Sequence, residues 1–114
     1  MKDDKLYLIY IVECLSRIQQ YTVEGKDGFM RDSKTQDAVL RNLQTLSEST
    51  QHISSHLKAA HDEVDWKRIA GFRNILVHEY LGVNMARVWE IIQHGLPELE
   101  NHVAAILREL KEPL

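Results

Sequence analysis

The sequence has little that would cross-link the chain or anchor it in a membrane. Its single cysteine, Cys14, cannot form an internal disulfide. This favours a reducing compartment, so we expect a cytoplasmic protein with Cys14 buried as a small apolar residue. No apolar run approaches the ~20 residues that a membrane-spanning helix needs, and no signal-peptide pattern is visible. We therefore expect no membrane association.

Chain-breaking residues and excess positive charge are also scarce. Two prolines and five glycines leave few possible breaks, and a chain of 114 residues is about one domain. We therefore expect a single domain over residues 1–114. The formal net charge of -3 argues against a generally basic nucleic-acid-binding domain. Binding to nucleic acid would need a local basic patch or a second subunit.

The apolar residues that are present recur at helical spacing. The first predicted helix runs from Asp4 to about Glu24, with Gly25 as its stop and a connector over 26–32 after it. The second starts at the capping box of residues 33–36 and extends for about 25 residues. The apolar residues that mark the two helices are Leu8, Ile11, Leu15 and Ile18, then Val39, Leu43, Leu46, Ile53 and Leu57.

The second half of the chain predicts three more helices. One runs from Trp66 to about Leu81, and Asn84 caps the next. Gly95 and Pro97 separate that helix from a last one, which carries Leu99, Val103, Ile106 and Leu110. No strand-like alternation occurs anywhere in the sequence. The predicted fold class is all-α, an up-and-down bundle of about five helices.

One eight-residue stretch, Arg73-Asn74-Ile75-Leu76-Val77-His78-Glu79-Tyr80, places polar chemistry inside an amphipathic helix. Arg73 lies four residues from both Ile69 and Val77, and seven before Tyr80. We therefore expect Arg73 and Tyr80 on the stripe that faces a core or a partner. An arginine there is costly unless it is paired or borders a wet site.

The Arg73-x4-His78-x-Tyr80 pattern resembles that of the HEPN superfamily, and within it the HepT-type toxins. The likeness extends to the Asp-Asp-Lys-Leu-Tyr-Leu-Ile opening, the central residues 36–43, the Trp66-x2-Ile69-Ala70-Gly71 lead-in, Val88-Trp89 and Leu96-Pro97. This chain departs from the family in two places. Relatives often have Gly-Glu-Ala where it has Ser47-Glu48-Ser49, and a loop proline before the motif helix is replaced.

The resemblance implies a homodimeric, metal-independent endoribonuclease, the toxin of a type VII-like toxin–antitoxin pair. Arg73 and His78 would be catalytic, with Asn74 and Glu48 in support, and no cofactor or metal is expected. A nucleotidyltransferase antitoxin of the MNT type would transfer AMP to Tyr80 and silence the toxin. The chemistry is reasonable, because RNA supplies its own 2′-hydroxyl nucleophile and a histidine titrates near neutral pH.

Other interpretations stay open at this stage. The chain could be a non-catalytic helical binding module that partners a nucleotidyltransferase. Arg73 could simply pair with Glu48 or Glu79, and Tyr80 could be an interface residue with a packed ring. The spacing of His52 and His56 could bind a metal, although an exposed helix face explains it better. A set of basic residues could form a rim for the RNA backbone, or an ordinary solvated face: Lys58, Lys67, Arg68 and Arg73.

Overall fold

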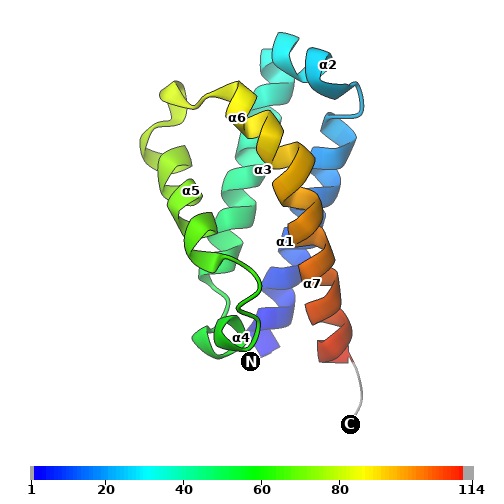
Figure 1. Cartoon of the computed structure of the whole chain (residues 1–114), viewed down its shortest axis with the longest axis vertical. Helices are drawn as coiled ribbons and strands as arrows, with labels where there is room; N and C mark the ends of the chain where they lie inside the picture. Colours follow the sequence, from blue (N-terminus) through cyan, green and yellow to red (C-terminus); the bar gives the residue numbers. More distant parts are fainter. Residues whose placement is uncertain (1, 112–114) are drawn as a thin grey trace.

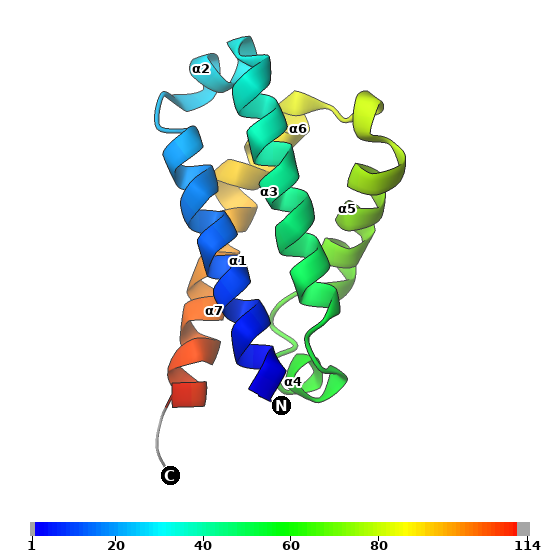
Figure 2. The same ribbon diagram turned by 180° about the vertical axis from the view of Figure 1, so that it is seen from behind.

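The computed structural model describes residues 2–111, and their main elements are long helices that alternate in direction (Figure 1). α1 (Lys2–Tyr21) packs against α3 (Ser33–Gln51), α3 packs against α5 (Trp66–His78), and α1 packs against α7 (Leu96–Lys111). Seen from behind, α1 and α3 lie side by side between α5 and α7 (Figure 2). No residue in the described range 2–111 forms a strand, so the all-α, up-and-down prediction is confirmed.

The core forms where the apolar periodicity places it. The predicted residues Leu8, Ile11 and Ile18 of α1 are buried with Val39 and Leu43 of α3, and so is Cys14. The other fully or nearly fully buried apolar residues are Leu15, Phe29, Leu40, Leu46, Ile53, Leu57, Val64, Leu76, Val88, Leu96, Leu99, Val103 and Ile106. Leu110 was expected on this face, but it is exposed. No helix within residues 2–111 is long and apolar enough to span a membrane.

The predicted connector over 26–32 is wrong, because these residues form the short helix α2 (Gly25–Arg31). Gly25 does not directly end α1; it has a φ of 84° and begins α2. Phe29 is buried, and the centre of its ring lies 5.5 Å from the centre of the Trp89 ring. This burial stabilises the helix, although its two glycines make the local sequence typical of a loop. A Cβ at position 28 would lie 2.8 Å from Glu24 Cβ, which makes a glycine the residue that fits there.

The second predicted helix is too long, because α3 ends at Gln51 and α4 (Ser55–Ala60) follows it. Its cap is also one residue earlier than expected, since the Asp32 side chain accepts a hydrogen bond from Lys34 N. Ser54 caps α4 through a bond from Leu57 N, and the buried Asp4 accepts bonds from both the backbone N and the Oγ of Ser54. Asp4 therefore secures the α3–α4 turn.

The predicted break at Gly95 and Pro97 is absent. α6 (Met85–Glu90), capped by Asn84 as expected, continues through a π-helical turn (Ile91–Gly95) into α7. Residue 91 has φ and ψ of -62° and -44°, and residue 96 has -69° and -41°, so both remain helical. The extra residue of a π turn accommodates Gly95 and Pro97 without ending the helix. The helix across the front of the bundle is therefore continuous from Met85 to Lys111 (Figure 1).

Candidate active site

The motif helix α5 is the least buried of the long helices. The face that it turns toward the core also differs from the expected one. Among its residues only Leu76 is fully buried, while Ile69 and Phe72 pack half-buried against the core. Val77, expected on the inner stripe, is 38% exposed. The inner stripe thus runs through Ile69, Phe72 and Leu76, which places Arg73 at its edge, with 27% of its side chain exposed.

Arg73 is held between its own helix and α3. Its Nη1 donates to Asn74 Oδ1 at 3.3 Å, and its Nη2 lies 3.5 Å from Glu48 Oε2. The Nε atom is buried and has no hydrogen-bond partner within residues 2–111. The structure therefore brings together Arg73, Asn74 and Glu48, and it leaves the Nε donor of the guanidinium unpaired. A buried donor without an acceptor costs free energy, which marks Arg73 as an unusual residue of this helix.

His78 is the last residue of α5 and is exposed to solvent. Its ring makes no hydrogen bond or ion pair with any residue in the described range. An unpaired, exposed imidazole is free to exchange protons with a substrate. The structure shows no contact between His78 and Arg73, in keeping with an ideal-helix separation of about 140°.

Tyr80 lies beyond the helix that was expected to hold it. α5 ends at His78, and Tyr80 begins a 3-10 turn (Tyr80–Gly82). Its hydroxyl donates to Asp37 Oδ1 at 3.4 Å, and Asp37 is on α3. Partial burial, followed by the negative charge and hydrogen bond of Asp37, raises the pKa of Tyr80 above its usual value. Tyr80 is nevertheless 38% exposed, so its hydroxyl end lies near the surface.

Sequence reasoning missed Asp37, although a signal for it exists. Asp37 precedes Glu48 by 11 residues, about three helical turns, so the two share one face of α3. Because α5 runs antiparallel to α3, the two carboxylates meet the two ends of the motif: Glu48 at Arg73 and Asp37 at Tyr80. The spacing of Asp37 and Glu48 indicates a shared site only once α3 is known to pack against α5.

The surface around two of the four basic residues is of mixed charge. Lys58 and Lys67 line a hollow of about 620 Å³ around Trp66, but acidic residues share it: Asp62, Glu63 and Asp65. Lys58 Nζ sits 5.9 Å from the centre of the Trp66 ring. Arg68 and Arg73 are not among the residues that line this hollow.

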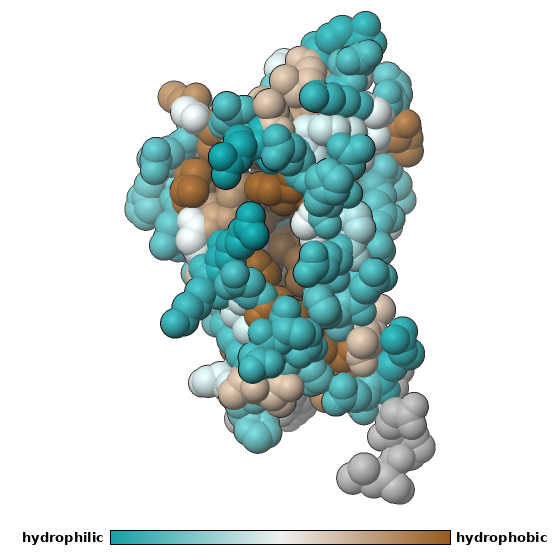
Figure 3. Space-filling view, in the orientation of Figure 1, coloured by the Kyte–Doolittle hydropathy of each residue, from teal (hydrophilic) through white to brown (hydrophobic). Residues whose placement is uncertain are grey.

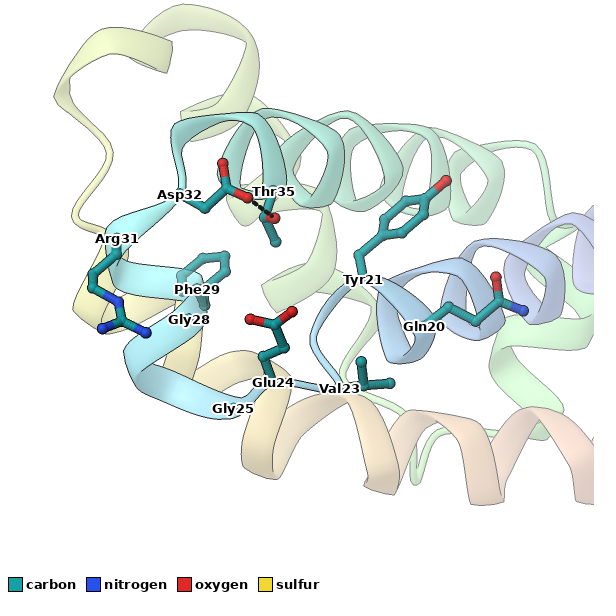
Figure 4. A pocket seen from close by; sticks show the side chains of 10 residues that line it. All are labelled: Gln20, Tyr21, Val23, Glu24, Gly25, Gly28, Phe29, Arg31, Asp32 and Thr35. Carbon is teal, nitrogen blue, oxygen red and sulfur yellow. Dashed lines mark hydrogen bonds between the residues drawn. The ribbon is translucent and has the colours of Figure 1, made fainter.

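A second hollow, of about 250 Å³, lies at the other end of the bundle between α1, α2 and α3 (Figure 4). Tyr21, Glu24, Phe29 and Thr35 surround it, and the Arg31 side chain points away from it. Asp32 Oδ2 accepts a hydrogen bond from Thr35 Oγ1, so this acceptor already has a partner. The hollow lacks the pair of cation and free imidazole that the motif provides.

Of the two histidines with metal-like spacing, His52 stacks on Tyr7 with ring centres 4.8 Å apart. Within residues 2–111, no group of three or more histidine, cysteine, aspartate or glutamate side chains is arranged to hold a metal. The motif on α5 therefore remains the strongest candidate for an active site.

An all-α bundle that presents Arg-x4-His on one exposed helix is the arrangement that the HEPN resemblance led us to expect. The family model described as "Ribonuclease HepT-like" matches residues 11–106, and the chain belongs to this family.

Relatives agree with this assignment. The chain is 36% identical over 112 residues, covering 97% of this chain and all of the relative, to "Putative RNase TTE0752" of Caldanaerobacter subterraneus. It is 33% identical, over 87% of its length and 91% of the relative's, to "Probable ribonuclease HepT" of Thermococcus cleftensis. A protein of Methanocaldococcus jannaschii named "Gamma-glutamylcyclotransferase and putative RNase MJ0434" is 31% identical over 96% of this chain, which spans half the length of that protein. No solved structure matches the chain.

Proposed function

We propose that this chain is a metal-independent endoribonuclease that acts as the toxin of a toxin–antitoxin pair, with Arg73 and His78 as its catalytic residues. The main support for this proposal is the arrangement of the Arg73 and His78 side chains in a member of the HepT-like family. Arg73 is held in place by Glu48 and Asn74 while its Nε stays unpaired, and the His78 ring is exposed and unpaired.

The reaction requires proton transfer and charge stabilisation, and these side chains supply both. The ribose 2′-oxygen attacks the adjacent phosphorus, its proton passes to a base, and the 5′-oxygen leaves with a proton from an acid. The products are a 2′,3′-cyclic phosphate end and a 5′-hydroxyl end. His78 fits the base or acid role, and the Arg73 guanidinium binds the non-bridging oxygens as charge grows on them.

A homodimer would supply the second proton-transferring group. One chain offers one such histidine, and acid and base act on opposite sides of the phosphorus, so we propose that two copies of α5 border one cleft. The exposed apolar residues at the end of the motif support a partner there: Ile75, Val77 and Leu81, the last 99% exposed. Apolar side chains also gather in a hollow between α5 and α6–α7, ringed by hydrophilic residues (Figure 3).

Tyr80 is the proposed site of silencing by a nucleotidyltransferase antitoxin of the MNT type. Its hydroxyl lies two residues beyond His78 and near the surface, which makes it accessible to a modifying enzyme. An AMP group there would place a bulky anion beside Arg73 and His78, where it would compete with the phosphate of the substrate.

Asn74 supports the site by accepting a hydrogen bond from Arg73.

The decisive experiment is cleavage of cellular RNA by the purified protein in excess EDTA, with mass spectrometry to confirm that Tyr80 is unmodified. The wild type should leave 2′,3′-cyclic phosphate ends, and His78→Ala should be slower by about 10²–10⁴-fold. His94→Ala is the matched control, because His94 is exposed and lies outside the motif. Absence of cleavage by the unmodified wild type would contradict the proposal and favour a non-catalytic binding module.

A further inference from the structure

A polar stripe on α3 borders the motif helix. Asp37, Arg41, Gln44 and Glu48 follow one another at spacings of four, three and four residues. At 100° per residue these positions fall within about 60° of each other around the helix. Their shared face is the one that meets the two ends of the motif.

Both ends of this stripe are fixed by contacts with the motif. Glu48 lies 3.5 Å from Arg73, and Asp37 accepts the hydrogen bond from Tyr80. Arg41 lies between them, about 6 Å along the helix axis from Asp37 and about 10 Å from Glu48, at 1.5 Å per residue. On α5 the six residues 74–79, which include His78, lie between the same two contacts, so Arg41 lies on the face of α3 that borders the motif.

Arg41 has no partner of its own in the described range. Its side chain is exposed, and it makes no hydrogen bond or ion pair with any residue from 2 to 111. The hydrogen bond to Arg41 is made at its carbonyl oxygen, which accepts from Thr45 Oγ1. Arg73 differs, because it is already oriented by two neighbours. The site therefore offers one arginine held in position and a second that is free to move.

We propose that Arg41 binds a backbone phosphate of the RNA next to the phosphate that Arg73 and His78 act on. The inference rests on the proposed ribonuclease function and adds a substrate-positioning residue to it. A guanidinium presents a planar fork of donors that matches two phosphate oxygens. Each phosphate that a protein neutralises releases counterions, which makes the contact measurable through the salt dependence of binding.

The test compares Arg41→Ala with Arg108→Ala, which removes the same charge from an exposed position on α7, across the bundle from α5. Binding is measured by fluorescence anisotropy with a synthetic single-stranded RNA whose riboses are 2′-O-methylated, so that it cannot be cleaved. Using protein with unmodified Tyr80 ensures that RNA supplies the only phosphate. Steady-state cleavage of the unmethylated RNA gives KM and kcat.

We expect Arg41→Ala to weaken binding several-fold, to raise KM more than it lowers kcat, and to reduce the salt slope of log K by about 0.7. Arg41→Lys should restore most of the slope, because the charge is kept. The inference about Arg41 is overturned if Arg41→Ala and Arg108→Ala have the same salt slope of log K and the same KM. If Arg73→Ala and His78→Ala are inactive in that case, the proposed function still stands. Full activity of the Arg73→Ala and His78→Ala variants would instead overturn the proposed function.

Discussion

The Arg73 guanidinium lies 3.5 Å from the Glu48 carboxylate of α3, while its own Nε is buried without a hydrogen-bond partner within residues 2–111. Glu48 is half-exposed, so the pair contributes little to folding, about 0–1 kcal/mol. Its role is better explained by orientation, since it holds the Nη2 atom of Arg73 in place.

Glu48→Gln should lower kcat for RNA cleavage and leave the melting temperature nearly unchanged. The amide keeps the shape of the side chain but removes the charge that orients Arg73. Arg73→Ala should have the larger effect, about 10²–10³ in kcat, because the donor to the phosphate is lost altogether. Glu13→Gln, at an exposed position on α1, is the control. Equal kcat values for Glu48→Gln and Glu13→Gln would refute the orienting role.

Asp37→Asn should lower the pKa of Tyr80 toward its ordinary value. Partial burial contributes most to the raised pKa, and the Asp37 charge and hydrogen bond add to it, so the variant removes only part of the shift. The titration is followed by phenolate absorbance. Because Tyr7, Tyr10 and Tyr21 also absorb, the signal of Tyr80 is obtained by subtracting the curve of Tyr80→Phe. A pKa that stays the same or rises would show that Asp37 does not contact the phenol in solution.

Tyr80→Phe should keep ribonuclease activity but should no longer be silenced by the nucleotidyltransferase. The phenyl ring retains the packing of Tyr80 but has no oxygen to accept AMP. Expressed alone, the variant should arrest growth as the wild type does, and co-expression of the nucleotidyltransferase should no longer relieve the arrest. Tyr21→Phe, at a similarly exposed tyrosine, should still be relieved. Relief of the Tyr80→Phe variant would exclude modification of Tyr80 as the means of silencing.

The long helices could be predicted because their apolar residues recur over three or more turns. Leu8, Ile11 and Ile18 in α1, and Val103 and Ile106 in α7, are all buried as expected. The short elements could not be predicted in the same way. α2 contains two glycines and one buried aromatic residue, Phe29, so the local pattern indicates a loop. Contacts with other segments stabilise the helix: Phe29 packs against Trp89, and Gln36 Nε2 donates to the carbonyl oxygen of Phe29.

The candidate site was predictable as a set of residues but not as an arrangement. The spacing of Arg73 and His78 is fixed by the sequence, whereas the side of α5 that becomes buried depends on its packing against α3. The inner face was expected to include Val77, but Leu76 is buried there with Phe72 packed beside the core, and Val77 is exposed. The contact of Arg73 with Glu48 was one of the expected pairings, whereas the contact of Tyr80 with Asp37 joins distant segments that no local pattern connects.

Two glycine-to-alanine changes should have opposite effects on stability. Both positions lie inside helices, where alanine is favoured over glycine by about 1 kcal/mol. At Gly71 of α5 a Cβ meets no atom within 4 Å, so Gly71→Ala should stabilise the fold by up to about that amount. At Gly28 of α2 the new Cβ would lie 2.8 Å from Glu24 Cβ, so Gly28→Ala should destabilise. Urea unfolding measures both, and stabilisation by Gly28→Ala would show that this close approach does not exist in solution.

The Asp4 carboxylate should make stability depend on pH. Burial by itself raises the pKa of Asp4, but the hydrogen bonds from the backbone N and Oγ of Ser54, together with nearby positive charge that includes His56, hold the pKa below its usual value. A group with a lowered folded-state pKa stabilises the fold above its unfolded pKa, near 4, and loses that stabilisation as the pH falls through the folded value. The expected loss lies in the acid range, below about pH 4.

Asp4→Asn should therefore destabilise the protein at pH 7, by about 1–3 kcal/mol for a buried bond to a charged group, and should flatten the acid part of the stability curve. Urea unfolding between pH 7 and pH 2.5 measures both effects. Asp3→Asn is the matched control, because Asp3 lies in the same first turn of α1 but is exposed. Both substitutions remove one negative charge near the helix N-terminus, so any effect of the helix dipole is shared. If the two variants lose equal stability, the bonds from Ser54 to Asp4 add nothing beyond the loss of charge that the two variants share.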